Sequence, residues 1–307
     1  AIAEVAALGA LILAHPLSVA IRGKTTADTY SIGASKEWLE DWLVRTCELI
    51  DKYQPKILYF DWWIHNHSFK PFLKKLCAYY YNRAEEWGEE VTINYKHEAF
   101  PPTVATFDVE RGALTYISPI PWQTDTAIGK DSWGYRKDNT YKSTRQIITD
   151  LIDIVSKNGM LLLNIGPKPD GTITDEETQV LKELGEWMKL NGEGIYGTTF
   201  WKQFGEGDVN NEEGFFKDRE EKAFTEKDFR FTYKCGSIYA FQMRPNGENA
   251  VIKALKKRNP HDFIIKRITL LSTSETLKFE RNDNELIIKA NENFNNSSPI
   301  CFKIEID

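Results

Sequence analysis

The sequence contains little cysteine, methionine or histidine, with four, three and five residues respectively among 307. The cysteines lie far apart in the chain: Cys47, Cys77, Cys235 and Cys301. None forms a CxxC pair, so the spacing indicates neither a disulfide framework nor a zinc site. Only His65 and His67 stand close together, and two histidines on a loop are more typical of a solvated surface than of a metal site. We therefore expect no metal, no cofactor, and reduced thiols in a cytoplasmic protein.

Long basic runs are also missing. The formal net charge is −6 at pH 7, and the cluster Lys253–Arg258 is short. Nucleic acids and anionic membranes are held mainly by Lys and Arg clusters, so we expect neither as a partner. The stretch Ile2–Arg22 is apolar but lacks a basic region before it and is interrupted by polar residues and a proline. It predicts neither a signal peptide nor a clean membrane span, and we expect an atypical apolar segment over residues 1–35.

Helical and strand patterns alternate from residue 36 to residue 201. Apolar residues recur at helical spacing in 36–53, 69–87, 143–157 and 174–192. Ser35 is a candidate N-cap for the first helix, and the pairs Ser143/Gln146 and Thr174/Glu177 are capping boxes that open the last two. Short apolar runs typical of strands occupy 57–60, 91–95, 160–165 and 195–201. The run at 160–165 is apolar until Asn164, as in a strand buried on both faces. This alternation is the pattern of parallel βαβ units.

The pattern changes after about residue 202, where short alternating strands recur without helical spacing. They are expected at 229–233, 237–243, 264–271, 285–290 and 300–306. Such strands indicate a separate antiparallel β domain. A long polar and aromatic stretch, 96–142, interrupts the alternation of helices and strands in the first part of the chain. It contains only short extended candidates such as Leu114–Ser118. A segment of this length without periodicity is usually functional or disordered, and its aromatic content favours the ordered interpretation.

Asp61 directly follows the apolar residues ILYF in the stretch ILYFDWW at residues 57–63. A parallel α/β sheet presents its site at the carboxyl ends of its strands, so Asp61 is a candidate for chemistry. The alternative is that it caps the following turn or pairs with a nearby cation.

Five stretches in order resemble one family, the retaining α-L-fucosidases. They are YQPKILYFDWW (53–63), INYKHEAFPPTVATFDVERG (93–112), PWQTDTAIGKDSWGY (121–135), LLLNIGPKPDGTI (161–173) and NGEGIYGTTFW (191–201). The resemblance implies a (β/α)8 barrel of the TIM type followed by an antiparallel β-sandwich. Three barrel strands precede the nucleophile strand in that family, but too few residues precede 36–53 here, and the strings HWG and KHHDGF are absent.

We therefore expect a partial barrel, about strands four to eight, over residues 36–205, and a C-terminal β-sandwich over 206–307. An open barrel would leave unpaired sheet edges and exposed apolar side chains, so we expect a homo-oligomer, with residues 2–14 covering part of the gap.

The resemblance also implies the two catalytic carboxyl groups. Asp61 aligns with the nucleophile, and Glu110 in FDVERG stands where several members have the acid/base, with Glu98 and Asp108 as alternatives. Glu110 could instead pair with Arg111 or face outward on a loop. A retaining glycosidase needs its two carboxyl groups about 5–5.5 Å apart, one ionised and one protonated.

The family pattern suggests further contacts with the sugar. The candidates are Trp62, Trp63, Lys96, His97, Trp122 and Gln123. Aromatic walls would exclude water and separate the pKa values of the two acids, whereas Lys96 and His97 could equally be loop charges.

The resemblance thus predicts an exo-α-L-fucosidase acting on fucosylated glycans or glycosides, by hydrolysis or transfer. Two alternatives remain open: a truncated, self-assembling scaffold with little or no catalysis, and a glycosidase for another sugar on the same frame.

Overall fold

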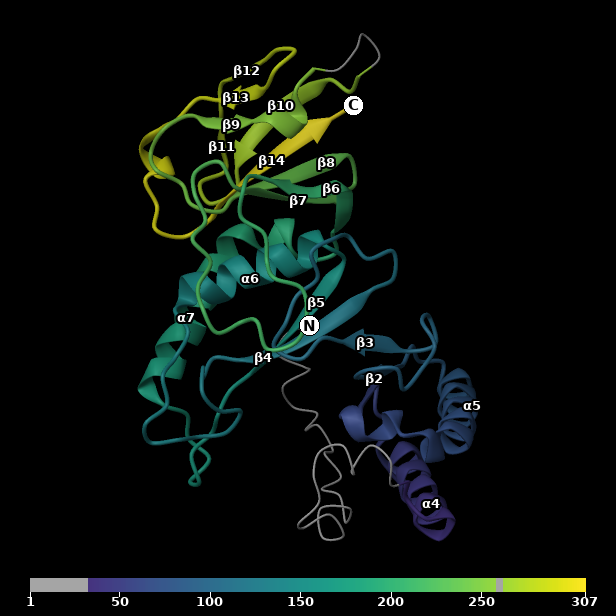
Figure 1. Ribbon diagram of the computed structural model, residues 1–307. Coiled ribbons are helices and arrows are strands. Elements are labelled where there is room, and N and C mark those ends of the chain that lie inside the picture. Colours follow the sequence, from purple (N-terminus) through teal and green to yellow (C-terminus); the bar gives the residue numbers. More distant parts are fainter. Residues whose placement is uncertain (1–32, 258–261) are drawn as a thin grey trace. The chain divides into compact units, whose positions relative to one another are not determined.

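The computed structural model describes residues 33–257 and 262–307 (Figure 1). The expected apolar segment therefore lies outside the described residues except for its last three positions. The chain divides into two compact units, residues 1–108 and 109–307. The predicted boundary between residues 205 and 206 stays a prediction.

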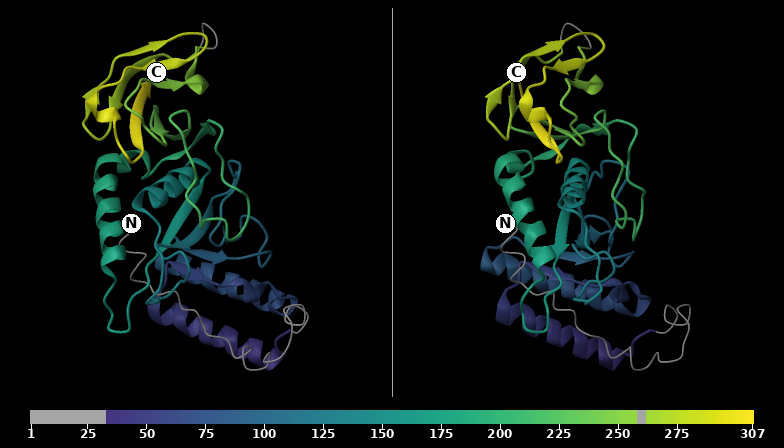
Figure 2. Two further views of the ribbon diagram at one scale, coloured as in Figure 1. Left: turned by 60° about the vertical axis from the view of Figure 1, so that its left-hand side comes forward. Right: turned by 90° about the vertical axis from the view of Figure 1, so that its left-hand side faces the viewer.

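The first unit contains two helices and three short parallel strands. Helix α4, Lys36–Tyr53, begins where predicted, because the hydroxyl of Ser35 accepts a hydrogen bond from the amide of Trp38. Helix α5, Lys70–Trp87, ends at a left-handed Gly88. The two helices lie side by side in Figures 1 and 2. The strands are β1 (Ile57–Tyr59), β2 (Thr92–Tyr95) and β3 (Thr106–Asp108), paired in that order.

Apolar side chains from the helices and from the turn after β1 form the core of this unit. Trp42 from α4 packs edge-on against Phe69, with ring centroids 5.3 Å apart. Leu76 of α5 and Ile93 of β2 belong to the same cluster and are fully buried. The apolar faces predicted for the two helices therefore face this core, which also contains residues from the turn after β1.

The second unit begins with a parallel pair, β4 (Trp122–Ala127) and β5 (Gly159–Asn164), with Trp122 opposite Gly159. Sequence reasoning missed β4 because its central residues are polar, although every residue of the strand is buried. The expected extended segment at Leu114–Ser118 is wrong, since no regular strand forms there. The strand β5 was placed correctly, but its expected burial on both faces is wrong: Met160 is 47% exposed.

Two helices accompany this pair. They are α6 (Thr144–Ser156) and α7 (Asp175–Asn191). Both begin at the predicted caps, since the Ser143 hydroxyl accepts from the amide of Gln146 and the Thr174 hydroxyl accepts from the amide of Glu177. These hydrogen bonds satisfy amides that have no partner within the helix, which is why the capping boxes located both starts.

Antiparallel sheets form the rest of the second unit. The larger sheet has the order β11-β10-β14-β8-β7-β6 and the smaller one β12-β13-β9. The strands of the larger sheet are β6 (Thr199–Glu206), β7 (Phe229–Lys234), β8 (Ser237–Gln242), β10 (Ile265–Leu270), β11 (Glu275–Thr276) and β14 (Ile300–Ile306). Those of the smaller sheet are β9 (Ala250–Ile252), β12 (Phe279–Arg281) and β13 (Leu286–Ile288).

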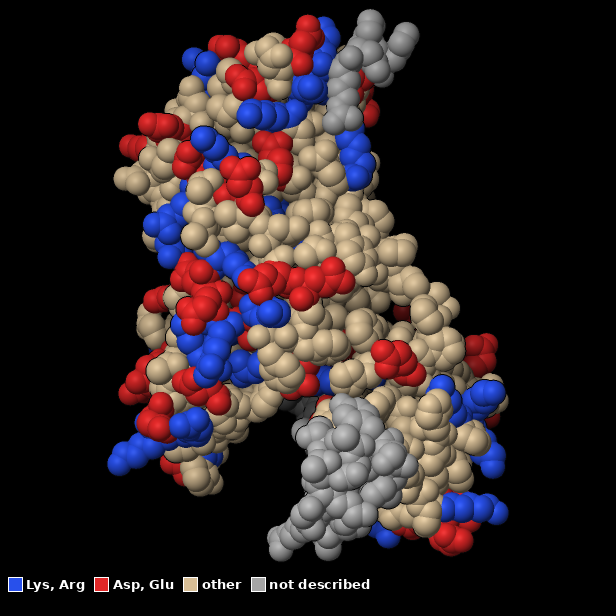
Figure 3. All heavy atoms as spheres, viewed as in Figure 1, with Lys and Arg blue, Asp and Glu red and all other residues tan. Residues whose placement is uncertain are grey.

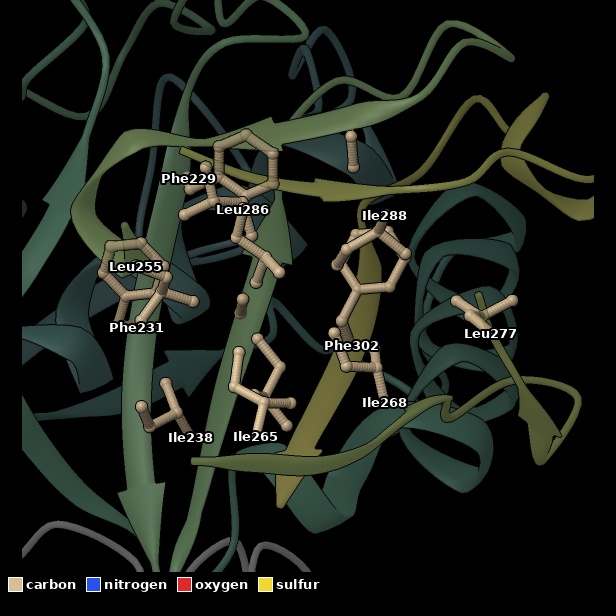
Figure 4. Packing of buried hydrophobic residues seen from close by; sticks show 14 of the residues in the cluster. Phe229, Phe231, Ile238, Leu255, Ile265, Ile268, Leu277, Leu286, Ile288 and Phe302 are labelled. Atoms are coloured by element: carbon tan, nitrogen blue, oxygen red, sulfur yellow. The ribbon is translucent and has the colours of Figure 1, made fainter. Parts of the chain in front are cut away.

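The parallel assignment of residues 195–201 is wrong, because the strand there is β6, which pairs antiparallel with β7. The predicted antiparallel strands are confirmed, and their two sheets enclose an apolar core. In Figure 4, Phe229 of β7 lies near Leu286 of β13, and Phe302 of β14 lies near Ile288 of β13, all four of them buried. Alternate residues of a strand point to one face, which is why the period-2 pattern found this core.

A long connection between β6 and β7 descends from the antiparallel sheet along the parallel strands of the same unit (Figures 1 and 2). Gly214 in this connection forms an isolated antiparallel bridge with Ala113. Among the helices of the described residues, none is both long enough and apolar enough to cross a membrane.

Candidate active site

Asp61 lies two residues past the end of β1 and caps the short helix that follows. Its carboxylate accepts a hydrogen bond from the amide of Trp62 at 2.9 Å, and the Nζ of Lys96 lies 3.6 Å from the same oxygen. Both parts of the alternative interpretation, a turn cap and a cation partner, are thus present. The Asp61 side chain is nevertheless 43% exposed, whereas that of Lys96 is only 4% exposed. A fixed, accessible carboxylate at the carboxyl end of a parallel strand remains suited to attack on a ligand.

Lys96 and His97 follow β2, the strand next to β1, so the adjacent strand ends bring them toward Asp61. Lys96 also lies over the ring of Tyr59, with 5.7 Å between its Nζ and the ring centroid. His97 adopts a left-handed backbone with φ 54° and places its ring 5.4 Å from that of His65. A non-glycine residue in this conformation carries strain, which occurs often at functional sites.

The aromatic side chains after Asp61 form a stacked pair. The ring centroids of Trp62 and Trp63 are 3.8 Å apart with 23° between the planes. The ring of His65 lies 6.1 Å from that of Trp62. Burial lowers the pKa of His65, and the nearby His97 lowers it further. The first unit thus gathers Asp61, Trp62, Trp63, Lys96 and His97 at one end of its strands.

Glu110 belongs to the second unit, and its backbone is held on two sides. The amides of its neighbours Val109 and Arg111 donate to the carbonyls of Gln123 and Asp125 in β4, each at 2.8 Å. The carbonyl of Glu110 accepts from the amide of Phe216 at 2.9 Å. Glu110 is half-buried; of the alternative acids, Asp108 is fully buried and Glu98 is exposed.

The guanidinium of Arg111 points into the protein. It donates to the carbonyls of Gly129 and Lys130 at 2.9 and 3.3 Å, and its carbon lies 4.4 Å from the centroid of the Trp133 ring. Its NH1 lies 3.7 Å from Asp218. Arg111 thus fixes the segment that carries Glu110.

Trp122 and Gln123 are both buried, with exposed fractions of 1% and 8%. The Trp122 indole donates to the carbonyl of Lys157 at 3.0 Å. A Cβ on Gly159 would stand 2.6 Å from the indole ring, so the ring packs directly on that backbone. Trp122 also begins β4, and so lies at the strand end opposite the carboxyl end. It presents no face to a sugar, and its place in the structure is that of a packing residue.

A buried ionic cluster beside this segment was not foreseen from the sequence. Lys142, with a fully buried side chain, contacts Thr126 at 2.6 Å and Asp218 at 2.5 Å. A cavity of about 20 Å³, room for one water molecule, is lined by residues including Asp150 and Asp218. Burial raises the pKa of Asp150 to about 7; Lys142 opposes the rise, and Asp153 and Asp218 add to it. No local motif marks these residues, because the loop that supplies Asp218 lies far from Lys142 in the sequence.

On the face of the second unit seen in Figure 3, acidic and basic side chains are intermixed. Among the described residues, no group of three or more His, Cys, Asp or Glu side chains could hold a metal ion.

Comparison with known proteins gives consistent matches. A family model described as alpha-L-fucosidase matches residues 19–193. Human plasma alpha-L-fucosidase is 32% identical over 173 residues, which cover 50% of this chain and 34% of that protein. Tissue alpha-L-fucosidase of Macaca fascicularis is 42% identical over 207 residues, covering 61% and 40%. The chain therefore spans well under half the length of these curated relatives.

Solved structures agree with the sequence matches. The Thermotoga maritima alpha-fucosidase in complex with fucose is similar with a TM-score of 0.66 and 28% identity, over 88% of this chain and 57% of that chain. Alpha-L-fucosidase isoenzyme 1 from Paenibacillus thiaminolyticus has a TM-score of 0.67 at 19% identity, over 94% of this chain and 66% of that one. The second likeness shows the fold alone.

Proposed function

The chain belongs to the α-L-fucosidase family, and on that premise we propose that it is a glycoside hydrolase that releases terminal α-L-fucosyl residues with retention of configuration. The observation that carries the proposal is Asp61, an accessible carboxylate at the carboxyl end of a parallel strand beside the buried Lys96. Fucosylated glycans or glycosides are the proposed substrates.

In the first step, a carboxylate oxygen of Asp61 attacks the anomeric carbon, and the bond to the leaving oxygen breaks. Glu110 gives its proton to that oxygen. In the second step, Glu110 takes a proton from water, which attacks the same carbon and frees Asp61. The mechanism requires the two carboxyl groups to stand about 5–5.5 Å apart.

The surrounding groups have separate proposed roles. Lys96 and the cap at Trp62 hold the Asp61 carboxylate in one orientation, which counts because a reacting group must be positioned before attack. Trp62, Trp63 and His97 form the wall against the sugar, where aromatic faces suit the apolar face of a pyranose. Gln123 is proposed to contact the sugar or to support the segment that carries Glu110. Trp122 is not part of the proposed site.

The test is hydrolysis of 4-nitrophenyl α-L-fucoside by the unchanged chain and by Asp61→Gly. We expect the variant to lose activity by at least about 10³-fold, and added azide to restore nitrophenol release with β-L-fucosyl azide as product. Asp138→Gly, which removes a 75% exposed loop carboxylate, is the matched control and should keep full activity. Equal inactivity of the unchanged chain and Asp61→Gly would favour the scaffold alternative.

The finer fold and assembly are further proposals. We infer strands four to eight of a barrel, and association with further copies through its edges. Light scattering tests the assembly: a mass above that of one chain is expected, and a single species at monomer mass contradicts it.

A further inference from the structure

The connection between β6 and β7 carries an exposed aromatic residue next to Glu110. Phe216 is 61% exposed, and its amide donates to the carbonyl of Glu110 at 2.9 Å. The two residues thus lie side by side at the backbone. Its neighbour Lys217 donates in the same way to the carbonyl of Arg111 at 2.7 Å.

The backbone of Phe216 is in a conformation that favours glycine, with φ 57°. A phenylalanine there is strained, and a ring left mostly in water gains little packing to offset the strain. Arg111, whose carbonyl accepts from the amide of Lys217, also has a positive φ of 46°. Two strained non-glycine residues in neighbouring backbone contacts are typical of a functional site rather than of a simple surface loop.

The segment around Phe216 is held firmly in place. At one end, Gly214 approaches Gly112 so closely that a Cβ on Gly112 would stand 2.0 Å from the Gly214 carbonyl oxygen. At the other end, Asp218 binds the buried Lys142 at 2.5 Å, and its carbonyl accepts from the side chain of Gln146 at 2.9 Å. The ring is therefore exposed on a fixed backbone and not on a loose one.

We propose that Phe216 is the platform for the leaving group of the glycoside. This inference rests on the proposed function, because it takes Glu110 as the acid that protonates the leaving oxygen. The group attached to that oxygen must lie on the side of Glu110, and Phe216 is the exposed aromatic residue whose backbone pairs with that of Glu110. The ligand class is a leaving group with a flat apolar face, either an aryl ring or the apolar face of a pyranose.

Two substrates separate this contact from the chemistry. 4-Nitrophenyl α-L-fucoside has an aromatic leaving group, whereas α-L-fucosyl fluoride loses a single atom that cannot reach a platform. The measured quantity is the ratio of kcat/KM for the nitrophenyl substrate to kcat/KM for the fluoride. We expect Phe216→Ala to lower this ratio about 5- to 10-fold, and Phe216→Trp to keep it within about 2-fold of the unchanged chain.

Two further variants guard the interpretation. Tyr53→Ala removes an aromatic side chain of matched exposure, 60%, from the end of α4, and should leave the ratio unchanged. Phe216→Gly suits the positive φ, so its urea midpoint should equal or exceed that of the unchanged chain while its ratio falls as in Phe216→Ala.

Each other result overturns the platform. If Phe216→Ala lowers kcat/KM equally for both substrates, or for neither, Phe216 does not contact the leaving group, and the proposed hydrolase activity is unaffected by that result. A change of mass in light scattering for Phe216→Ala without a change of ratio would assign the ring to contact between copies. An unchanged chain silent on both substrates would overturn the proposed function, and the platform with it.

Discussion

Asp153 on α6 offers the sharpest test of how the second unit is held together. Its side chain is 1% exposed and binds two cations that are themselves buried: Lys157 at 2.7 Å and Arg230 at 2.5 Å. Asn211 donates to the same carboxylate at 2.5 Å. Arg230 lies on β7 and also donates to the carbonyl of Val209 at 2.7 Å. One carboxylate thus joins α6, the antiparallel sheet and the start of the long connection.

Replacing Asp153 by alanine leaves both cations buried without their carboxylate. Removal of one partner from a buried ion pair costs about 3–5 kcal/mol, because the remaining charge stays out of water. We expect Asp153→Ala to lower the free energy of unfolding by that amount, measured by urea unfolding followed by circular dichroism. Asp138→Ala, which breaks the exposed pair with Arg136, is the matched control and should leave the urea midpoint unchanged. If Asp153→Ala lowers the free energy of unfolding by less than about 1 kcal/mol, the buried Lys157 and Arg230 do not depend on this carboxylate.

The same site predicts a pH dependence. Burial alone would raise the pKa of Asp153, but Arg230 and Lys157 outweigh it and hold the pKa below its usual 3.8. A carboxyl group with a lowered pKa in the folded state contributes stability above about pH 3.8 and loses it as the pH falls through the folded value. Asp153→Asn should therefore show a flatter acid limb than the unchanged chain, whereas an identical slope below pH 4 would contradict the assignment.

Two further measurements address other buried groups. Burial raises the pKa of Asp150 to about 7, so the contribution of this carboxyl group to stability is full below about pH 3.8 and declines as the pH rises through 7. Asp150→Asn should therefore exceed the unchanged chain in unfolding free energy by about 2–4 kcal/mol at pH 8 and match it near pH 4. No gain at pH 8 would count against a buried carboxyl group. Burial also raises the pKa of Cys301 well above 9, whereas Cys235 is exposed. A thiol reagent should therefore label Cys235 in the folded chain and Cys301 only in urea. Prompt labelling of Cys301 in the folded chain would contradict its burial.

The sequence predicted those elements whose pattern is local. The Ser143 and Thr174 caps located the starts of α6 and α7, because a cap and its partner lie three residues apart. Asp61 could be placed beyond a strand end because the apolar run before it is short and clear. The alternating residues of β7 likewise predicted its place in the antiparallel sheet.

Elements that depend on distant partners could not be read in this way. The strand β4 was missed because Gln123, Thr124 and Asp125 are polar yet buried, and their burial depends on neighbours elsewhere in the fold. Trp122 was expected at a sugar site, but it packs on the backbone of Gly159. The contact between Phe216 and Glu110 joins residues from distant parts of the chain, and no spacing rule predicts it.

The proposed covalent bond between Asp61 and the sugar can be trapped and identified. The probe is an α-L-fucosyl fluoride with fluorine in place of the 2-hydroxyl group. This fluorine slows the hydrolysis of the covalent intermediate more than it slows the release of fluoride, so the ester between the sugar and Asp61 should accumulate. Mass spectrometry of a protease digest is predicted to find one fucosyl group on the peptide that contains Asp61, and none in Asp61→Gly. A label on any other carboxylate, or fluoride released by an active chain with no labelled peptide, would contradict the account.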